Sequence, residues 1–154
     1  MRPLSKDVQE FIRLLNKTAA EYLIVGAWSA AMHGYPRYTG DLDVFVRSSP
    51  VNAERLMSAL KQFGFGEIGI TSEDFLKSDY IVQLGIEPNR IDLLTGISGV
   101  TFDEAWKTRK TVTLQGEQVF VISRDLLIRN KEATGRPKDL LDVDALKRIA
   151  RPGT

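Results

Sequence analysis

Apolar residues recur along this chain with two periods, and the longer period predicts helices. Over residues 7–16 they fall three and four positions apart, as on one face of a helix, and Ser5 stands at the expected N-cap position. A similar run over residues 50–62 stops near Gly64, a typical helix end. Five helices are predicted in this way, at residues 7–16, 28–33, 50–62, 123–133 and 137–149.

The shorter period, in which apolar and polar residues alternate, predicts strands. Six runs of this kind occur, at residues 22–25, 41–46, 80–84, 90–94, 111–114 and 118–122. The last four runs form two pairs, each joined by a link that contains glycine, as in hairpins. Helix and strand signals alternate along the chain without internal repeats, which indicates an α/β (α+β) fold.

Two carboxylates flank one leucine at the start of the second predicted strand. Alternation divides this strand between two faces, with Leu42, Val44 and Val46 on one and Asp41, Asp43 and Phe45 on the other. Two aspartates on the same face repel each other unless a cation or hydrogen-bond donors compensate them. Magnesium suits such a site, since it prefers hard oxygen ligands. The alternative is a surface turn in which the aspartates accept backbone hydrogen bonds.

A third acid favours the metal over the turn. Asp92 interrupts an otherwise apolar strand in Arg90-Ile91-Asp92-Leu93-Leu94. If this strand lies beside the strand of Asp41 and Asp43, the three carboxylates form a triad that can hold one or two divalent ions. Such triads occur in two-metal phosphoryl transfer.

Composition limits the classes of protein that remain. With 154 residues, 43% of them hydrophobic and 27% charged, the chain suits one globular domain over residues 1–154. Its 21 basic and 20 acidic residues exclude the overall charge of a general nucleic-acid binder. Cysteine is absent, which excludes disulfides and cysteine metal sites. No signal peptide and no apolar run of about 20 residues is found, so we expect a cytoplasmic protein without a membrane segment.

Three groups of residues together resemble a known family. These are Gly26-Ala27, followed by thirteen residues and Asp41-Leu42-Asp43; the lone Asp92; and Lys131-x-x-x-Gly135-Arg136-x-Lys138-Asp139-x-x-Asp142. The combination is similar to the nucleotidyltransferases of the DNA polymerase β-like superfamily. More narrowly, it is similar to small bacterial members related to the abortive-infection type of toxin. The resemblance extends from about Leu23 to Leu146.

This resemblance implies a fold and a reaction. The fold is the nucleotidyltransferase fold, a mixed sheet that carries the acids on one face and helices on its other face, with a C-terminal helix pair. The reaction is Mg²⁺-dependent transfer of a nucleoside monophosphate from a nucleoside triphosphate to a hydroxyl. Asp41, Asp43 and Asp92 would be the catalytic and metal-binding residues, and Asp92 also a candidate general base. The acceptor stays open between a tRNA end, a protein and a small molecule.

The resemblance also places nucleotide-binding residues. Gly26 and Ala27 would meet the phosphates through backbone N–H groups at a helix start, although Gly26 alone also suits a plain tight turn. Ala27 departs from the family, which has serine or glycine there, and Ser29 is a weak substitute. Lys131 and Lys138 match a late basic group that approaches the phosphates. Arg37 is either a phosphate clamp or an ion-pair partner of the acids.

Other polar and aromatic residues have simpler interpretations. The only histidine, His33, is expected to have a hydrogen-bonded structural role, because no soft ligands accompany it. Asp139 is expected to orient a neighbouring base or cap the last helix rather than bind a metal. Trp28, Trp106 and Phe45 suit the core or a pocket wall.

Two alternatives to an enzyme remain. A non-catalytic nucleotide- or protein-binding module would explain Ala27, whereas the buried acids, costly unless they are used, argue against it. A partner in a toxin–antitoxin pair is compatible with either function. The oligomeric state is not indicated by the sequence.

Overall fold

A six-stranded mixed sheet forms the centre of the protein. The computed structural model describes residues 4–35, 40–64, 69–86 and 89–149. The strands are β1 (Tyr22–Val25), β2 (Leu42–Val46), β3 (Ile81–Leu84), β4 (Ile91–Leu94), β5 (Lys110–Leu114) and β6 (Glu117–Val121). Their order across the sheet is β3-β4-β2-β1-β6-β5. Each corresponds to a strand expected from the alternation of apolar and polar residues.

Parallel and antiparallel pairs alternate across this sheet. The two outer hairpins, β3–β4 and β5–β6, are antiparallel, and so is the central pair β1–β2. The pairs β2–β4 and β1–β6 are parallel. The mixed sheet predicted from the sequence is therefore confirmed.

Helices surround the sheet, and all five that the sequence predicts are present. The helical segments are α1 (Lys6–Lys17), α2 (Gly26–Met32), α3 (Pro50–Phe63), the 3₁₀ helix η1 (Ser72–Leu76), α4 (Phe102–Lys107), α5 (Arg124–Thr134) and α6 (Pro137–Arg148). The periodicity missed η1 and α4 because each is too short to show a repeat. A different signal marks both, since Thr71 with Asp74 and Thr101 with Glu104 form capping boxes at their starts.

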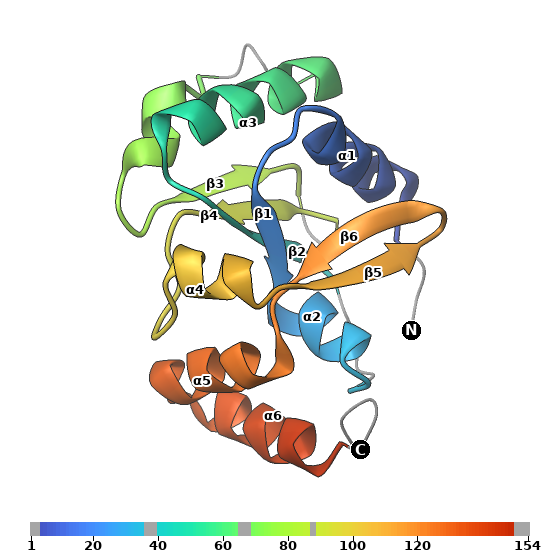
Figure 1. The fold of residues 1–154 in the computed structure, drawn as a ribbon, viewed down its shortest axis with the longest axis vertical. Coiled ribbons are helices and arrows are strands. Elements are labelled where there is room, and N and C mark those ends of the chain that lie inside the picture. Colours follow the sequence, from blue (N-terminus) through green and yellow to red (C-terminus); the bar gives the residue numbers. More distant parts are fainter. Residues whose placement is uncertain (1–3, 36–39, 65–68, 87–88, 150–154) are drawn as a thin grey trace.

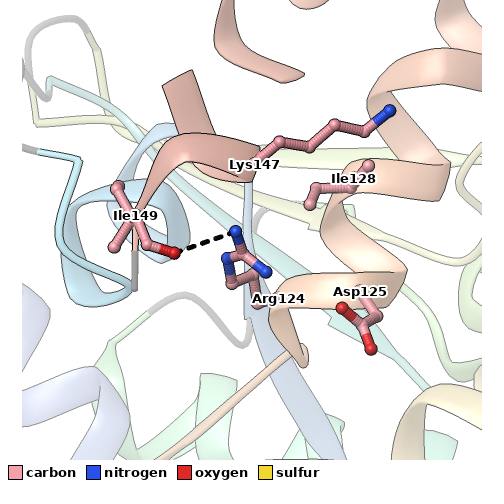
Figure 2. A pocket seen from close by; sticks show the side chains of 5 residues that line it. All are labelled: Arg124, Asp125, Ile128, Lys147 and Ile149. Atoms are coloured by element: carbon pink, nitrogen blue, oxygen red, sulfur yellow. Dashed lines mark hydrogen bonds between the residues drawn. The ribbon is translucent and has the colours of Figure 1, made fainter. Parts of the chain in front are cut away.

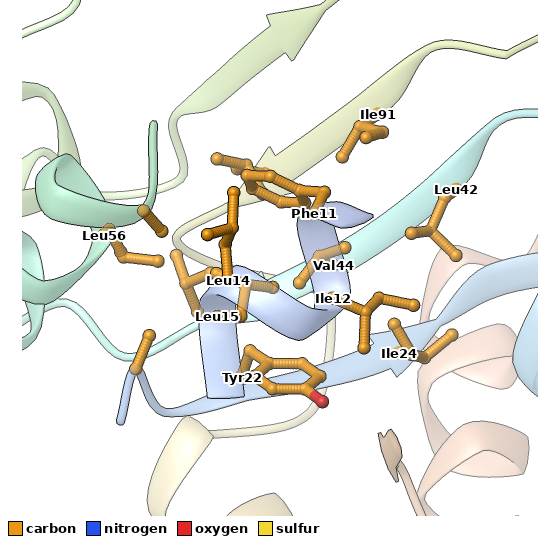
Figure 3. Close-up of a cluster of buried hydrophobic side chains, with 14 of the residues drawn as sticks. Phe11, Ile12, Leu14, Leu15, Tyr22, Ile24, Leu42, Val44, Leu56 and Ile91 are labelled. Carbon is orange, nitrogen blue, oxygen red and sulfur yellow. The ribbon is translucent and has the colours of Figure 1, made fainter. Parts of the chain in front are cut away.

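One face of the sheet packs against α1 and α3 (Figure 1). Leu42, Val44 and Val46 of β2 point to this side, as their alternation predicts. Figure 3 shows this core, in which Phe11 and Leu15 of α1 lie over the strands. All these side chains are almost completely buried.

The opposite face is covered too, which corrects the expectation of helices on one face only. Phe45 points away from its neighbours in β2 and joins a second core with residues of α4, α5 and α6. Its other buried members are Leu23, Val25, Ala30, Val100, Ala105, Ile122, Leu127, Ile128, Val143 and Leu146. The sheet therefore lies between two helical layers (Figure 1), and the predicted acids share a face with the C-terminal helices.

None of the described helices has both the length and the apolar character needed to cross a bilayer.

Candidate active site

The turn between β1 and α2 brings the backbone against an acidic side chain. Gly26 opens α2 with a φ of +68°, a conformation that favours glycine. A Cβ atom at this position would lie 2.4 Å from Oδ2 of Asp43. Val25, the residue before it, pairs with Asp43 across the sheet. The sequence thus uses glycine here both for the turn and for the close approach of the carboxylate.

The three predicted acids come from adjacent positions in the sheet. Asp43 in β2 is the register partner of Asp92 in β4, and Asp41 lies just before β2. Burial, followed by the charges of Asp92 and Asp41, raises the pKa of Asp43 to about 6. Arg90 and Lys131 oppose this rise. The acids are therefore close enough to act on one another electrostatically.

Arg90 is the residue that the sequence analysis missed. Its guanidinium donates to both carboxylate oxygens of Asp92, from Nε at 2.8 Å and from Nη2 at 3.1 Å. The same Nη2 lies 3.5 Å from Oδ2 of Asp41, and the backbone N–H of Arg90 donates to Oδ1 of Asp41 at 2.9 Å. Because alternate residues of a strand share a face, the spacing Arg90-x-Asp92 was a usable signal for this contact.

A second charged group ties the last two helices together. Lys131 of α5 is buried, and its Nζ donates to Oδ2 of Asp142 at 2.8 Å and lies 3.8 Å from Oδ1 of Asp139. Burial alone would raise the pKa of Asp139, but hydrogen bonds from Arg136 and Thr134 hold it below its usual value. Asp139 thus orients a neighbouring base, as expected.

Comparisons with known proteins agree with this architecture at the level of fold. The sequence matches no protein-family model and no curated protein. Three solved structures align with a TM-score of 0.57 each. One is a candidate nucleotidyltransferase from Thermotoga maritima, 14% identical, over 92% of this chain and 88% of that one. The chain has the nucleotidyltransferase fold.

The other two alignments cover even more of the chain. The lincosamide antibiotic adenylyltransferase LnuA, with lincomycin bound, is 12% identical over 97% of this chain and 100% of its own. An antigenic nucleotidyltransferase-like protein from Paracoccidioides brasiliensis is 16% identical over 99% of this chain and 81% of its own. At these identities the likeness concerns the fold.

Within this nucleotidyltransferase fold, the acids suit a metal by chemistry but are not arranged as a ready site. Their oxygens are the hard ligands that magnesium prefers. Among the described residues, however, no three acidic, histidine or cysteine side chains are placed to hold one ion together. Hydrogen bonds to Arg90 engage Asp92 and Asp41 instead.

The other predicted nucleotide-binding residues have different surroundings. The charge of Lys131 offsets part of the rise in the pKa of Asp43, whereas Lys138 lies exposed at the start of α6. Arg37 lies outside the described residues. Ala27 is partly exposed beside Gly26. Ser29 is buried and donates to the carbonyl of Gly26 at 2.7 Å, so its hydroxyl does not replace the one absent at Ala27.

His33 has the structural role that was expected. Its Nε2 lies 2.6 Å from the carbonyl oxygen of Ile122, which joins the end of α2 to the segment after β6. Burial lowers the pKa of His33, so the neutral ring is favoured.

A surface pocket of about 350 Å³ lies apart from the acids, between α5 and the end of α6. It is lined by Arg124, Asp125, Ile128, Lys147 and Ile149 (Figure 2). The guanidinium of Arg124 donates to the carbonyls of Leu146 and Ile149. Arg124 therefore caps the end of α6, and the pocket contains none of the predicted site residues.

Proposed function

We propose that the protein is a magnesium-dependent nucleotidyltransferase, which transfers a nucleoside monophosphate from a nucleoside triphosphate to a hydroxyl. The observation that carries this proposal is the placement of Asp43 between the Gly26 turn and Asp92, with Asp41 at the entrance to the same strand. The neighbours of the same fold support it, since one is described as an adenylyltransferase.

In this reaction Asp41, Asp43 and Asp92 would hold the magnesium. The ion would neutralise the phosphates and activate the attacking hydroxyl. Asp92, which accepts hydrogen bonds from Arg90 in the ligand-free protein, would act as the general base for that hydroxyl. The second helical layer, packed on the same face as Asp43, would help to exclude water from the reacting groups.

The positive charges near the acids would serve the triphosphate. Lys131 acts through its charge, because its ammonium group is bonded to Asp142. Lys138 and Arg37 would approach the phosphates directly, beside the backbone of Gly26 and Ala27. The acceptor is a tRNA end, a protein hydroxyl or a small molecule.

Incubation with each labelled nucleoside triphosphate and Mg²⁺ tests the proposal, with bulk tRNA or cell lysate as the source of acceptor. A labelled product is expected from the wild type and not from Asp43→Asn or Asp92→Asn. Asp144→Asn, at an exposed position of α6, is the matched control and should keep full activity. Absence of product with every triphosphate and acceptor, or an active Asp43→Asn variant, would contradict the proposal.

A second candidate function is a nucleotide- or protein-binding module without catalysis, possible also within a toxin–antitoxin pair. Two observations favour it, namely Ala27 in place of a hydroxyl and the engagement of Asp92 by Arg90. Calorimetry separates the two functions. Nucleotide binding without any labelled product supports the module, and turnover that depends on Asp43 supports the enzyme.

A further inference from the structure

We propose that Arg90 is a resident cation of the acidic site, which competes with a divalent ion for Asp92 and Asp41. This inference rests on the proposed function, because it concerns the same acids. It assigns to Arg90 a competing role that the sequence motifs did not indicate.

The first support is the geometry of the contacts. Two nitrogens of one guanidinium meet the two oxygens of Asp92 at 2.8 and 3.1 Å, which is the forked arrangement in which arginine binds carboxylates most strongly. One of these nitrogens also lies 3.5 Å from Asp41. The guanidinium therefore lies between two of the three acids that are proposed to hold the ion.

The second support is the burial of this group. The side chains of Arg90 and Asp92 are only 24% and 11% exposed, so water screens their attraction less than at an open surface. A magnesium ion at Asp92 would meet the positive charge of this guanidinium and compete with it for the same carboxylate.

The third support is the net charge of the three acids and Arg90 together. Three carboxylates and one guanidinium leave a formal charge of −2, which equals the charge that one divalent ion neutralises. Arg90 thus compensates one of the three negative charges of the ligand-free site. The same positive charge lowers the affinity of the site for a metal ion.

Asp41, unlike Asp92, has a contact with Arg90 that does not involve the guanidinium. The backbone N–H of Arg90 donates to Oδ1 of Asp41 at 2.9 Å, and this bond does not depend on the guanidinium. This backbone bond to Asp41 would therefore remain if the guanidinium moved away from Asp92. If Arg90 only positioned Asp92 for an ion, removing it would weaken metal binding.

The test is a titration with Mn²⁺, followed by the paramagnetic resonance of the free ion, in the absence of nucleotide. The variant Arg90→Gln should bind Mn²⁺ about tenfold more tightly than the wild type. A change of this size corresponds to the free energy of about one hydrogen bond to a charged group. Arg129→Gln is the matched control, because Arg129 forms an ion pair with Glu104 away from the acids, and it should bind as the wild type does.

A second variant, Arg90→Lys, keeps the test informative if Arg90→Gln does not fold. Arg90→Lys keeps the charge but not the fork, and it should give an intermediate gain in affinity. In the wild type, titration with Mg²⁺ should shift the Nε–H resonance of Arg90 as the carboxylates exchange partners.

The outcomes are distinct. Unchanged or weaker Mn²⁺ binding in Arg90→Gln and Arg90→Lys overturns the competition, while nucleotidyl transfer by the wild type would still support the proposed function. An Nε–H resonance that stays constant while Mg²⁺ binds also overturns it. Absence of Mn²⁺ binding in every variant overturns both the competition and the metal dependence.

Discussion

At Asp43, burial and the neighbouring negative charges both oppose ionisation of the side chain. Its side chain lies beside the Gly26 backbone and near two further carboxylates. The resulting rise of its pKa to about 6 means that the folded protein holds the proton more tightly than the unfolded chain. Ionised Asp43 therefore destabilises the fold, and a bound cation would remove this effect.

Asp43→Asn should stabilise the metal-free protein at neutral pH. Well below about pH 4 this carboxyl is protonated in both the folded and the unfolded wild type, so no gain is expected. As the pH rises from about 4 to 6 the wild type loses stability, and the variant should be more stable by up to about 3 kcal/mol above pH 6. Urea unfolding at pH 4 and pH 7.5 measures the difference. Lower stability of the variant at pH 7.5 would show that the carboxylate has a structural partner.

A comparison of alanine variants at Gly26 and Gly135 distinguishes the effect of backbone strain from that of a close contact. Their φ angles are +68° and +67°, so alanine strains both by about 1–2 kcal/mol. The nearest contact of a new Cβ is 2.4 Å at Gly26, to Asp43, but 3.8 Å at Gly135. Gly26→Ala should therefore lose more stability than Gly135→Ala and should also displace Asp43. Thermal melts with assays of nucleotidyl transfer compare them, and equal losses in both variants would contradict the close approach.

At the level of helices and strands, α5 and α6 are held together by charge as well as by apolar contacts. The side chain of Lys131 is 9% exposed, and those of Asp139 and Asp142 are 4% and 3% exposed. Buried charges of this kind add little stability compared with apolar residues, but removing one partner leaves the others uncompensated.

Lys131→Met should therefore destabilise the protein by about 3–5 kcal/mol. Lys147→Met is the matched control on the neighbouring helix. Lys147 is 57% exposed and lies 3.7 Å from Glu132, so its loss should cost less than about 1 kcal/mol. Urea unfolding of both variants decides the matter. The double variant Lys131→Met/Asp142→Asn should recover part of the loss, and equal effects of the two lysine variants would contradict a buried ion pair.

Strands and long helices could be predicted from the sequence because each leaves a periodic signal. The alternation in β2 correctly separated Val44 from Phe45, and both C-terminal helices were expected near their observed bounds. The coverage of the sheet on both faces could not be read in this way. It depends on α4, a helix of six residues, and on how α5 and α6 return to the sheet.

The candidate site, like the fold, could be predicted from the sequence only in part. The glycine turn and the three acids follow from local motifs, and the strand register brings Asp43 opposite Asp92. The sequence left Arg37 open between a phosphate clamp and an ion-pair partner of the acids, and Arg37 lies outside the described residues. Arg90, which the motifs did not indicate, pairs with Asp92 and Asp41. Choosing between two arginines requires the three-dimensional position of each, which spacing along the chain does not supply.

In the molecule as a whole, the sheet joins the two cores through the alternation of its strands. In β1, Leu23 belongs to one core and Ile24 to the other, and in β2 the same holds for Phe45 and Val44. A strand cannot leave one core without leaving the other. The two helical layers are therefore expected to unfold together, as one domain.

The two tryptophans of the chain can test this cooperativity, because they report on different layers. Trp28 is buried in the core that contains residues of α1 and α3, and Trp106 packs against the core that contains residues of α5 and α6. In Trp106→Phe and Trp28→Phe, each with one tryptophan, fluorescence should change at the same urea concentration. Adding Leu15→Ala, a cavity beside α1, should lower both midpoints together, by a loss of about 2–5 kcal/mol. A Trp106 signal that keeps its midpoint in Leu15→Ala would show instead that the C-terminal layer unfolds independently, and the single domain predicted from the sequence would be wrong.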